Sequence, residues 1–265
     1  MLGLYDDHPD NYADEEDLKV ALFIPCLVEQ FHPEVGIATA KVLTRAGVEV
    51  YYPKGQTCCG QPVYKSGLRK KTIPIAKYFI RLFERAEAIV APSGSCVSMV
   101  RNEYPVLFDN DPDWNQRAVE LGARVYELTE FLVKALQIDD LGAHWPGRAV
   151  YHDSCQVMRA LGVCEEPRKL LAHVKELELV EMDRPDLCCG FGGPFSFKFP
   201  EISEAMVGEK VSYVLVSKAE YLIGAEISCL MNMGGYLQKH GYPVKAVHIA
   251  EVLANRKKRK GCLAP

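Results

Sequence analysis

Cysteine is the residue type whose number and spacing most clearly suggest chemistry in this chain of 265 residues. The chain has ten cysteines, and eight of them form two sets of four. The first and second cysteines of a set are 32 residues apart in one set and 33 in the other, and the third and fourth are 37 and 40 apart. The two sets are Cys26, Cys58, Cys59 and Cys96, and Cys155, Cys188, Cys189 and Cys229. This repeat indicates an internal duplication, and only Cys164 and Cys262 lie outside it.

Each set contains two adjacent cysteines followed by a glycine, which is Gly60 in the first set and Gly190 in the second. Adjacent side chains on a strand point to opposite faces, so both thiols reach one site only if the backbone turns there. Glycine adopts positive φ at no steric cost. We therefore predict a turn at each glycine, with both thiols directed to the same site.

Four thiols drawn from three separated segments are typical of a metal site at the edge of an α/β sheet. A polynuclear iron–sulfur cluster offers several thiolate positions close together, and four cysteines match the requirement of a [4Fe–4S] cluster. We expect one or two such clusters, with the eight cysteines as ligands. Mononuclear zinc usually binds Cys-x₂₋₄-Cys pairs, which neither set contains, although a zinc site in one half is an alternative. Structural disulfides do not fit a reducing compartment.

A histidine lies close in sequence to the second set. His152 precedes Cys155 by three residues, near enough to donate a hydrogen bond to a cluster sulfur. It could equally be a histidine at a strand end that bonds to backbone, and the sequence does not decide between these roles. Asp153 either orients His152 or caps the following turn. His248 has the repeat position of Glu127, and we interpret it as an ordinary loop residue.

Apolar runs of strand length alternate with helical patterns, which is typical of a parallel α/β architecture. In the first half we predict strands at 18–24, 48–52, 88–91 and 124–128 and helices beginning at Pro33, around Ile75 and at 97–103. A loop is expected around 109–115, and Thr129 is a candidate cap for the helix after the fourth strand. In the second half we predict strands at 148–152, 177–181, 221–224 and 244–248 and helices at 167–175, 201–217 and 229–239.

The two halves also match in residues, because the segment 125–132 aligns with 246–253 and both place a glutamate one turn into a helix. We therefore expect two similar Rossmann-like α/β domains, produced by an internal duplication and related by a pseudo-twofold axis. The expected units are an acidic disordered tail at 1–17, a first domain at 18–146, a second domain at 147–254 and a basic tail at 255–265, with a linker at 137–147.

Half of the net charge of −4 comes from the two ends of the chain. The first 17 residues hold seven acidic side chains, and residues 256–260 are all Lys or Arg. The rest is nearly neutral, which gives no support for a nucleic-acid-binding face. There is no secretory signal, and no apolar stretch approaches the ~20 residues that span a bilayer. We expect a cytoplasmic protein with no membrane span.

The motifs around the cysteines resemble those of the Cys-Cys-Gly domain iron–sulfur proteins, which include the cysteine-rich B chain of heterodisulfide reductase and the iron–sulfur component of glycolate oxidase. The sequences at 22–28 (LFIPCLV), 56–62 (QTCCGQP), 92–96 (PSGSC) and 188–193 (CCGFGG) are more similar still to the L-lactate utilization protein A group. The resemblance covers roughly residues 18–254.

This resemblance implies an iron–sulfur electron-transfer subunit of a cytoplasmic complex that oxidises L-lactate, a small 2-hydroxy acid, to pyruvate. The implied partners are a ferredoxin-like iron–sulfur subunit and a third lactate-utilization subunit. The sequence contains no flavin or nicotinamide motif, so we expect part of an oxidoreductase rather than a complete enzyme.

The chain departs from the heterodisulfide reductase branch of the family at one position in each half. The heterodisulfide reductase branch has Cys-x-x-Cys at the end of each half, where this chain has Ser93 and Glu226 as the first of the two residues. The five-thiolate noncubane cluster of that branch is therefore not expected. A solvated loop side chain or helix cap is the expected role of both residues, and an oxygen ligand to a cluster is the alternative. The alternatives to lactate oxidation are a catalytic heterodisulfide or thiol–disulfide reductase and a zinc-stabilised interaction scaffold.

Overall fold

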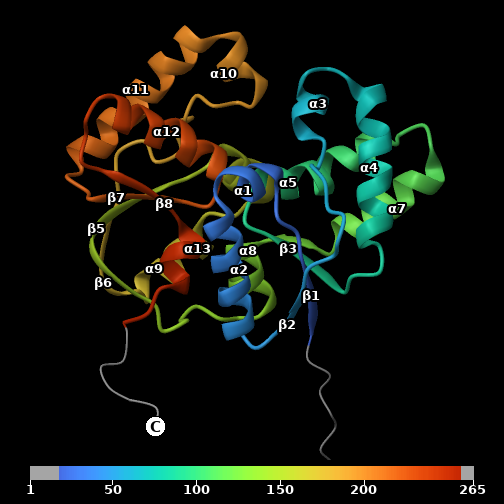
Figure 1. Cartoon of the computed structure of the whole chain (residues 1–265), viewed down its shortest axis with the longest axis horizontal. Coiled ribbons are helices and arrows are strands. Elements are labelled where there is room, and N and C mark those ends of the chain that lie inside the picture. Colours follow the sequence, from blue (N-terminus) through green and yellow to red (C-terminus); the bar gives the residue numbers. More distant parts are fainter. Residues whose placement is uncertain (1–17, 258–265) are drawn as a thin grey trace, which may run out of the picture.

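A computed structural model describes residues 18–257 of the chain (Figure 1). The acidic segment 1–17, most of the basic end and Cys262 lie outside the described residues. No helix within 18–257 is both long enough and apolar enough to cross a bilayer.

The first half forms a parallel sheet of four strands in the order β2-β1-β3-β4. Its strands are β1 (Lys19–Leu22), β2 (Glu49–Tyr51), β3 (Ala88–Ala91) and β4 (Val125–Glu127). Its longer helices are α2 (Pro33–Arg45), α4 (Arg69–Phe83) and α7 (Pro112–Gly122). Shorter helical segments are α1 (Cys26–Phe31), α3 (Gln61–Lys65), α5 (Gly94–Ser98), η1 (Met99–Glu103), α6 (Tyr104–Leu107), α8 (Leu128–Glu130) and η2 (Phe131–Ala135).

The second half repeats this topology, with four parallel strands in the order β6-β5-β7-β8. Its strands are β5 (His144–His152), β6 (Lys175–Val180), β7 (Tyr221–Gly224) and β8 (Lys245–His248). Its helices are η3 (Gln156–Ala160), α9 (Glu165–Ala172), α10 (Pro194–Lys198), α11 (Pro200–Val216), α12 (Ile227–Lys239) and α13 (Ile249–Ala254). The prediction of a duplicated α/β fold is confirmed.

The two halves share a hydrophobic core. In Figure 1, α13 of the second half lies beside α2 of the first, and buried side chains of both sheets belong to one apolar cluster. Arg45, in the last turn of α2, donates hydrogen bonds of 2.8 Å to the carbonyl oxygens of Leu253 and Ala254. A separate apolar cluster on the other face of the first sheet contains Phe23 and Phe79 together with Cys59 and Cys96.

A backbone bridge marks the relation between the halves. Ser93 and Glu226 each stand three residues before the last cysteine of a set, and they form an isolated antiparallel bridge with one another. A contact between equivalent residues is what a twofold axis through that point produces. The bridge therefore supports the pseudo-twofold arrangement.

Most strand predictions agree with the structure, whereas several helices were missed. The stretch 109–115, predicted as a loop, contains the start of α7, where Asp111 is the N-cap and Pro112 the first helical residue. The cap of α8 is Glu127, whose carboxylate accepts from the backbone N–H groups of Thr129 and Glu130, so the prediction of Thr129 as cap was wrong. Part of the predicted linker 137–147 belongs to β5.

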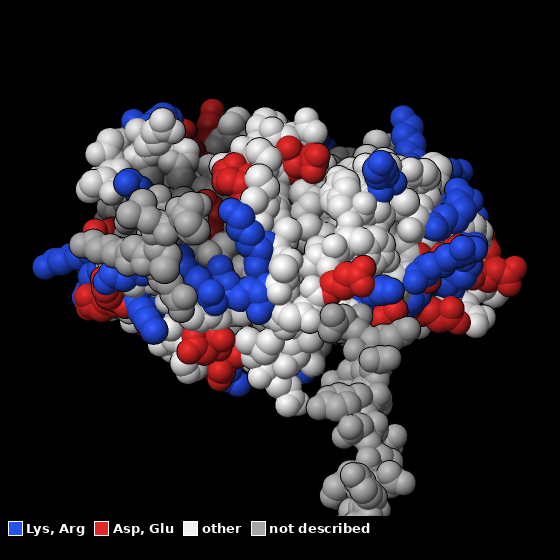
Figure 2. All heavy atoms as spheres, turned by 60° about the horizontal axis from the view of Figure 1, so that its bottom comes forward, with Lys and Arg blue, Asp and Glu red and all other residues white. Residues whose placement is uncertain are grey.

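Charged side chains of both signs are mixed on the surface. On the face in Figure 2, Lys and Arg lie close to Asp and Glu over several parts of the molecule. Exposed ion pairs include Lys239 with Glu204 at 2.6 Å and Arg148 with Glu178. Exposed pairs of this kind contribute little to stability, about 0 to 1 kcal/mol each.

Candidate metal centre

The cysteines of each set lie on the segments that follow three strands of their sheet. In the first half, Cys26 begins α1 after β1, the adjacent pair lies between β2 and α3, and Cys96 lies in α5 after β3. In the second half, Cys155 follows β5, the pair follows β6, and Cys229 lies in α12 after β7. The carboxyl ends of parallel strands meet at one edge of a sheet, so each topology gathers its four thiols there.

Sulfur atoms of the first set lie close together without forming disulfides. The Sγ atoms of Cys26 and Cys58 are 3.6 Å apart, and those of Cys59 and Cys96 are 3.4 Å apart. A disulfide would require about 2.05 Å. Every cysteine within 18–257 is a free thiol.

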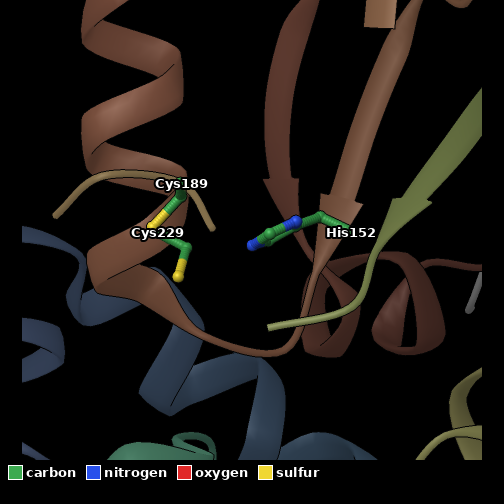
Figure 3. Close-up of side chains that lie close together, drawn as sticks. All are labelled: His152, Cys189 and Cys229. Carbon is green, nitrogen blue, oxygen red and sulfur yellow. The ribbon is translucent and has the colours of Figure 1, made fainter. Parts of the chain in front are cut away.

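The second set includes a histidine. A ring nitrogen of His152 and the Sγ atoms of Cys189 and Cys229 all lie within 4.8 Å of one another, and all three residues are buried. Figure 3 shows the imidazole extending from the end of β5 toward the two thiols. The sequence left the role of His152 open between a cluster neighbour and a residue bonded to backbone. Neither ring nitrogen has a hydrogen-bond partner among the described residues.

Both sets line one cavity of about 430 Å³ between the two halves. In each set, two cysteines are buried and two are half-buried. The cavity is also lined by Lys65 of α3, Lys198 of α10 and Glu226. In Figure 1, α3 and α10 lie at the same end of the molecule, one on each half. The sequence predicted two sets of thiols but did not predict that they share a cavity.

The turn at each glycine is present as predicted. Gly60 has φ of 84° and Gly190 has φ of 82°, in the left-handed region. The N–H of each glycine donates to the first sulfur of the pair, Cys58 or Cys188, at 3.4 Å in both halves. Donation to sulfur stabilises the thiolate form, which is the form that binds metal.

The same ionisation pattern occurs in both sets. The neighbouring Cys26 thiol lowers the pKa of Cys58 to about 3, and the neighbouring Cys155 thiol lowers the pKa of Cys188 to about 2. Their partners have raised pKa values, because a proton is shared with the thiolate and burial disfavours a second charge. In each half the first thiol of the adjacent pair is therefore the one whose ionisation is favoured.

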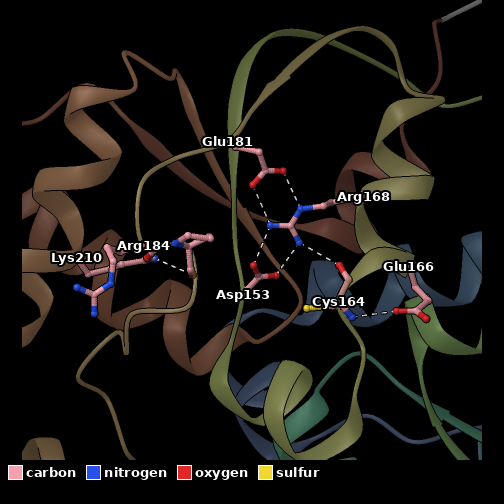
Figure 4. A network of polar contacts seen from close by, with 8 residues as sticks. Asp153, Cys164, Glu166, Arg168, Glu181, Arg184 and Lys210 are labelled. Carbon is pink, nitrogen blue, oxygen red and sulfur yellow. Dashed lines mark hydrogen bonds and ion pairs between the residues drawn. The ribbon is translucent and has the colours of Figure 1, made fainter.

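A network of charged side chains lies behind the second set (Figure 4). Arg168 donates to both carboxylate oxygens of Asp153 at 2.9 and 2.8 Å, and it also pairs with Glu181. Asp153 thus neither orients His152 by a hydrogen bond to its ring nor caps a turn, which corrects both predicted roles. Lys210 of α11 lies nearby with its side chain fully buried, and no sequence motif had singled it out.

Ser93 and Glu226 are buried, contrary to the expectation of solvated side chains. The Glu226 carboxylate accepts from the Ser93 hydroxyl at 3.0 Å, from the Ser95 N–H at 2.8 Å and from the Ser228 hydroxyl at 3.1 Å. Ser93 also accepts from the N–H of Cys96, as an N-cap of α5. The predicted role as a helix cap is therefore confirmed for Ser93, whereas Glu226 has no side-chain cap hydrogen bond to α12 and instead joins the two halves.

His248 is not the ordinary loop residue that the sequence suggested. It is buried at the end of β8, and its Nδ1 accepts from the Ala250 N–H as the N-cap of α13. Glu127 has the same position and the same capping role in the first half. Burial lowers the pKa of His248 to about 4 and raises that of Glu127 to about 7.

The donor atoms fit a metal centre of the thiolate type. Each half supplies four cysteine sulfurs, and the second half adds a buried imidazole with two unpartnered nitrogens, a costly arrangement unless a ligand satisfies them. Iron–sulfur clusters and zinc both bind such sulfur ligands.

The Cysteine-rich domain family (CCG) matches two segments of the chain, residues 20–101 and 149–234. Each segment contains one complete set of four cysteines. The fold and the sites thus define a protein with two copies of this cysteine-rich domain.

Three relatives are similar over nearly the whole described chain. Lactate utilization protein A of Geobacillus thermodenitrificans is 50% identical over 90% of this chain and 100% of its own length. Proteins of the same name from Exiguobacterium sp. (52% identity over 88% and 96%) and Bacillus velezensis (51% over 90% and 100%) are equally similar. The chain belongs to the lactate utilization protein A family.

Solved structures show only weak likeness. An aspartate racemase homologue from Pyrococcus horikoshii OT3 is 15% identical, with a TM-score of 0.32 over 89% of this chain and 96% of the other. A likeness at this level carries no inference about function.

Proposed function

We propose that the protein is an iron–sulfur electron-transfer subunit of a cytoplasmic complex that oxidises L-lactate to pyruvate. The observation that carries this proposal is the convergence of eight free thiols, four from each half, on one cavity. The relatives named lactate utilization protein A support the choice of lactate.

In this proposal the two sets of four cysteines each hold one [4Fe–4S] cluster, and a bound cluster supplies one-electron transfer. The glycine turns direct adjacent thiols to one site, and the glycine N–H groups stabilise thiolate at Cys58 and Cys188. All eight cysteines line the cavity, and two of each set are buried.

The cavity also suits a small 2-hydroxy acid. Lys65 and Lys198 supply positive charge that attracts a carboxylate, one from each half. The Glu226 carboxylate, also at the cavity, is fixed by its three donors and available to accept a hydrogen bond from a substrate hydroxyl.

The electrons must leave the protein for a partner. We propose the ferredoxin-like iron–sulfur subunit as their acceptor, with a third subunit completing the complex. Mixing the reduced protein with each purified partner and following the absorbance of the partner's chromophore tests this assignment. Oxidation of this chain without reduction of either partner contradicts it.

The central test is composition. Protein purified and reconstituted without oxygen should be brown, contain iron and acid-labile sulfide in equal amounts and give an EPR signal on reduction. A colourless protein that takes up neither iron nor sulfide contradicts the proposal.

A zinc-stabilised scaffold is a second candidate, favoured by two distances. The Sγ separations of 3.6 and 3.4 Å in the first set are close to the edge of a tetrahedron with zinc–sulfur bonds of about 2.3 Å, an edge of about 3.8 Å. About one zinc per set without iron would support this candidate and contradict the iron–sulfur proposal.

The reductase alternative lacks a comparable observation. Ser93 and Glu226 bond to one another where that branch has a cysteine, so neither half offers a fifth thiolate there. Rapid oxidation of the reduced protein by a disulfide substrate would revive this alternative.

A further inference from the structure

The residue three positions before the first cysteine of each set differs in chemical type between the halves. It is Phe23 before Cys26 and His152 before Cys155. Both side chains are buried at the end of an inner strand, β1 or β5, of their sheet. Phe23 belongs to the apolar cluster that contains Cys59 and Cys96, and His152 lies within 4.8 Å of Cys189 and Cys229.

A second difference lies on the helix packed behind each set. Thr72 of α4 lies against Gly60, and Ser203 of α11 lies against Gly190, so these residues are equivalent. Seven residues further along, α4 has Phe79 and α11 has Lys210. Phe23 and Phe79 pack edge to face in the first half, with ring centroids 4.8 Å apart. A pair of phenylalanines is thus replaced by histidine and lysine.

Lys210 brings a buried positive charge into the second half. Its side chain is fully buried, and its Nζ donates to the carbonyl oxygens of Arg184 and Pro185 at 2.8 Å each. Within residues 18–257 it forms no ion pair. Asp153, the acid that acts most strongly on Lys210, is itself paired with Arg168 (Figure 4).

The lysine is close enough to act on the second set. Pro185 accepts from both Lys210 and the backbone N–H of Asp153, the residue after His152. Burial lowers the pKa of Lys210 to about 8, so the ammonium form still predominates at pH 7. Asp153 and Asp186 favour that charged form most, and the sulfurs of Cys189 and Cys229 favour it as well.

We propose that Lys210 and His152 give the centre of the second half a higher reduction potential than that of the first, so that a single electron resides in the second half. This inference rests on the proposed function, because it requires a cluster in each half. Lys210 acts by its charge, and His152 acts as a donor to a sulfur of the centre.

The physical reason is electrostatic. Reduction adds a negative charge to the cluster, and a nearby buried cation stabilises that charge more strongly than it would in water. Hydrogen bonds to cluster sulfurs act in the same direction. Phe23 and Phe79 offer neither charge nor donor, and no Lys or Arg is fully buried in the described part of the first half.

The first test compares the centres one at a time. The variant Cys58→Ala/Cys59→Ala removes two ligands of the first set and retains the second centre, and Cys188→Ala/Cys189→Ala is its matched counterpart. Redox titration of each variant, followed by EPR, should give the higher midpoint potential in the variant that retains the second half. Equal potentials, or the reverse order, overturn the inference.

The second test changes the charge. Lys210→Met in the variant that retains the second centre should shift its midpoint potential downward, and Lys210→Arg should restore most of the shift. His152→Phe should also lower the potential. Phe79→Met at the equivalent position of the first half is the packing control and should leave the potential of either centre unchanged.

These measurements separate the two proposals. A protein that assembles both centres with potentials indifferent to Lys210→Met contradicts this inference alone. A protein that binds no iron or sulfide contradicts the proposed function and this inference with it. If Lys210→Met fails to fold, the midpoint potentials of the two paired cysteine variants still test whether the second centre has the higher potential.

Discussion

The two halves of the molecule have the same strand order and the same arrangement of four thiols, yet different residues support those thiols. The turn at the adjacent cysteines is nearly identical, with φ of 84° and 82° and an N–H to sulfur contact of 3.4 Å in each half. Behind that turn, the first half has packed phenylalanines, and the second has His152 and Lys210. The geometry that presents the thiols has therefore stayed the same between the copies, while the electrostatic surroundings have diverged.

The largest expected difference between the halves concerns the glycines of the turns. A Cβ at Gly190 would lie 2.7 Å from the backbone oxygen of Ser203, whereas one at Gly60 would meet the Thr72 methyl at 3.1 Å. Both substitutions force positive φ on alanine. We expect Gly190→Ala to lower the free energy of unfolding by about 4 kcal/mol and Gly60→Ala by about 2. Denaturation of the reduced, metal-free protein measures both, and equal losses would show that the two turns are supported alike.

The buried helix caps should give the halves opposite pH dependence. Glu127 has a folded pKa of about 7, above its ordinary 4.5, so the unfolded state loses the proton first and stability falls as pH rises through this window. His248 has a folded pKa of about 4, below its ordinary 6.5, so the unfolded state takes up the proton first and stability rises with pH. Each contribution amounts to about 3 kcal/mol across its window.

Single variants at Glu127 and His248 separate the two contributions to the pH dependence of stability. Relative to the parent, Glu127→Gln should become progressively more stable between pH 4.5 and 7. His248→Asn, whose amide oxygen replaces Nδ1 as the capping acceptor, should become progressively less stable as pH rises from 4 to 6.5. Denaturation curves at several pH values provide the measurement. If the stability of both variants relative to the parent changed in the same direction with pH, the two caps would not have opposite pH dependence.

The two residues of the bridge between the halves, Ser93 and Glu226, also contribute unequally. Glu226 receives three hydrogen bonds, two of them from the first half, whereas the Ser93 hydroxyl donates one. Glu226→Ala should lower the free energy of unfolding by about 2 kcal/mol and Ser93→Ala by about 1, because the first leaves more buried donors without an acceptor. Thermal unfolding of both variants side by side checks this order. A larger effect of Ser93→Ala would show that the carboxylate is not the centre of the bridge.

The smallest effect should be the same in both halves. The carbonyl oxygen of the second adjacent cysteine accepts from the Tyr104 hydroxyl in the first half and from the Asn232 amide in the second, at 2.7 Å in each case. Tyr104→Phe and Asn232→Leu should each cost about 1 kcal/mol of stability. A loss confined to one variant in denaturation experiments would mean that only one of the two carbonyl contacts stabilises its half.

The sequence predicted the strands and the repeated thiols well, because both are local or periodic features. The apolar runs at 88–91 and 221–224 coincide with β3 and β7, and the glycines after the cysteine pairs predicted their turns. Helix α7 was missed although Asp111 and Pro112 are good start signals, since its buried stripe of Ala118, Leu121 and Gly122 is short.

Features that depend on tertiary packing could not be predicted. Ser93 and Glu226 are polar residues on loops, and only the relation between the halves buries them against each other. Lys210 did leave a signal, because it lies beside the apolar Val207, Val211 and Val214 on α11. Aligning α11 with α4 residue by residue would have shown that Lys210 has the position of Phe79. The shared cavity follows from how the two sheets pack, which no residue pattern in one half encodes.

In the proposed function, each half holds its own cluster beside the shared cavity. The decisive measurement is the count of iron and sulfide per chain after anaerobic reconstitution, in the parent and in the paired variants Cys58→Ala/Cys59→Ala and Cys188→Ala/Cys189→Ala. We predict about eight iron and eight sulfide in the parent and about four of each in either variant. Loss of all the iron in either variant, or no loss in one of them, would contradict a separate cluster in each half.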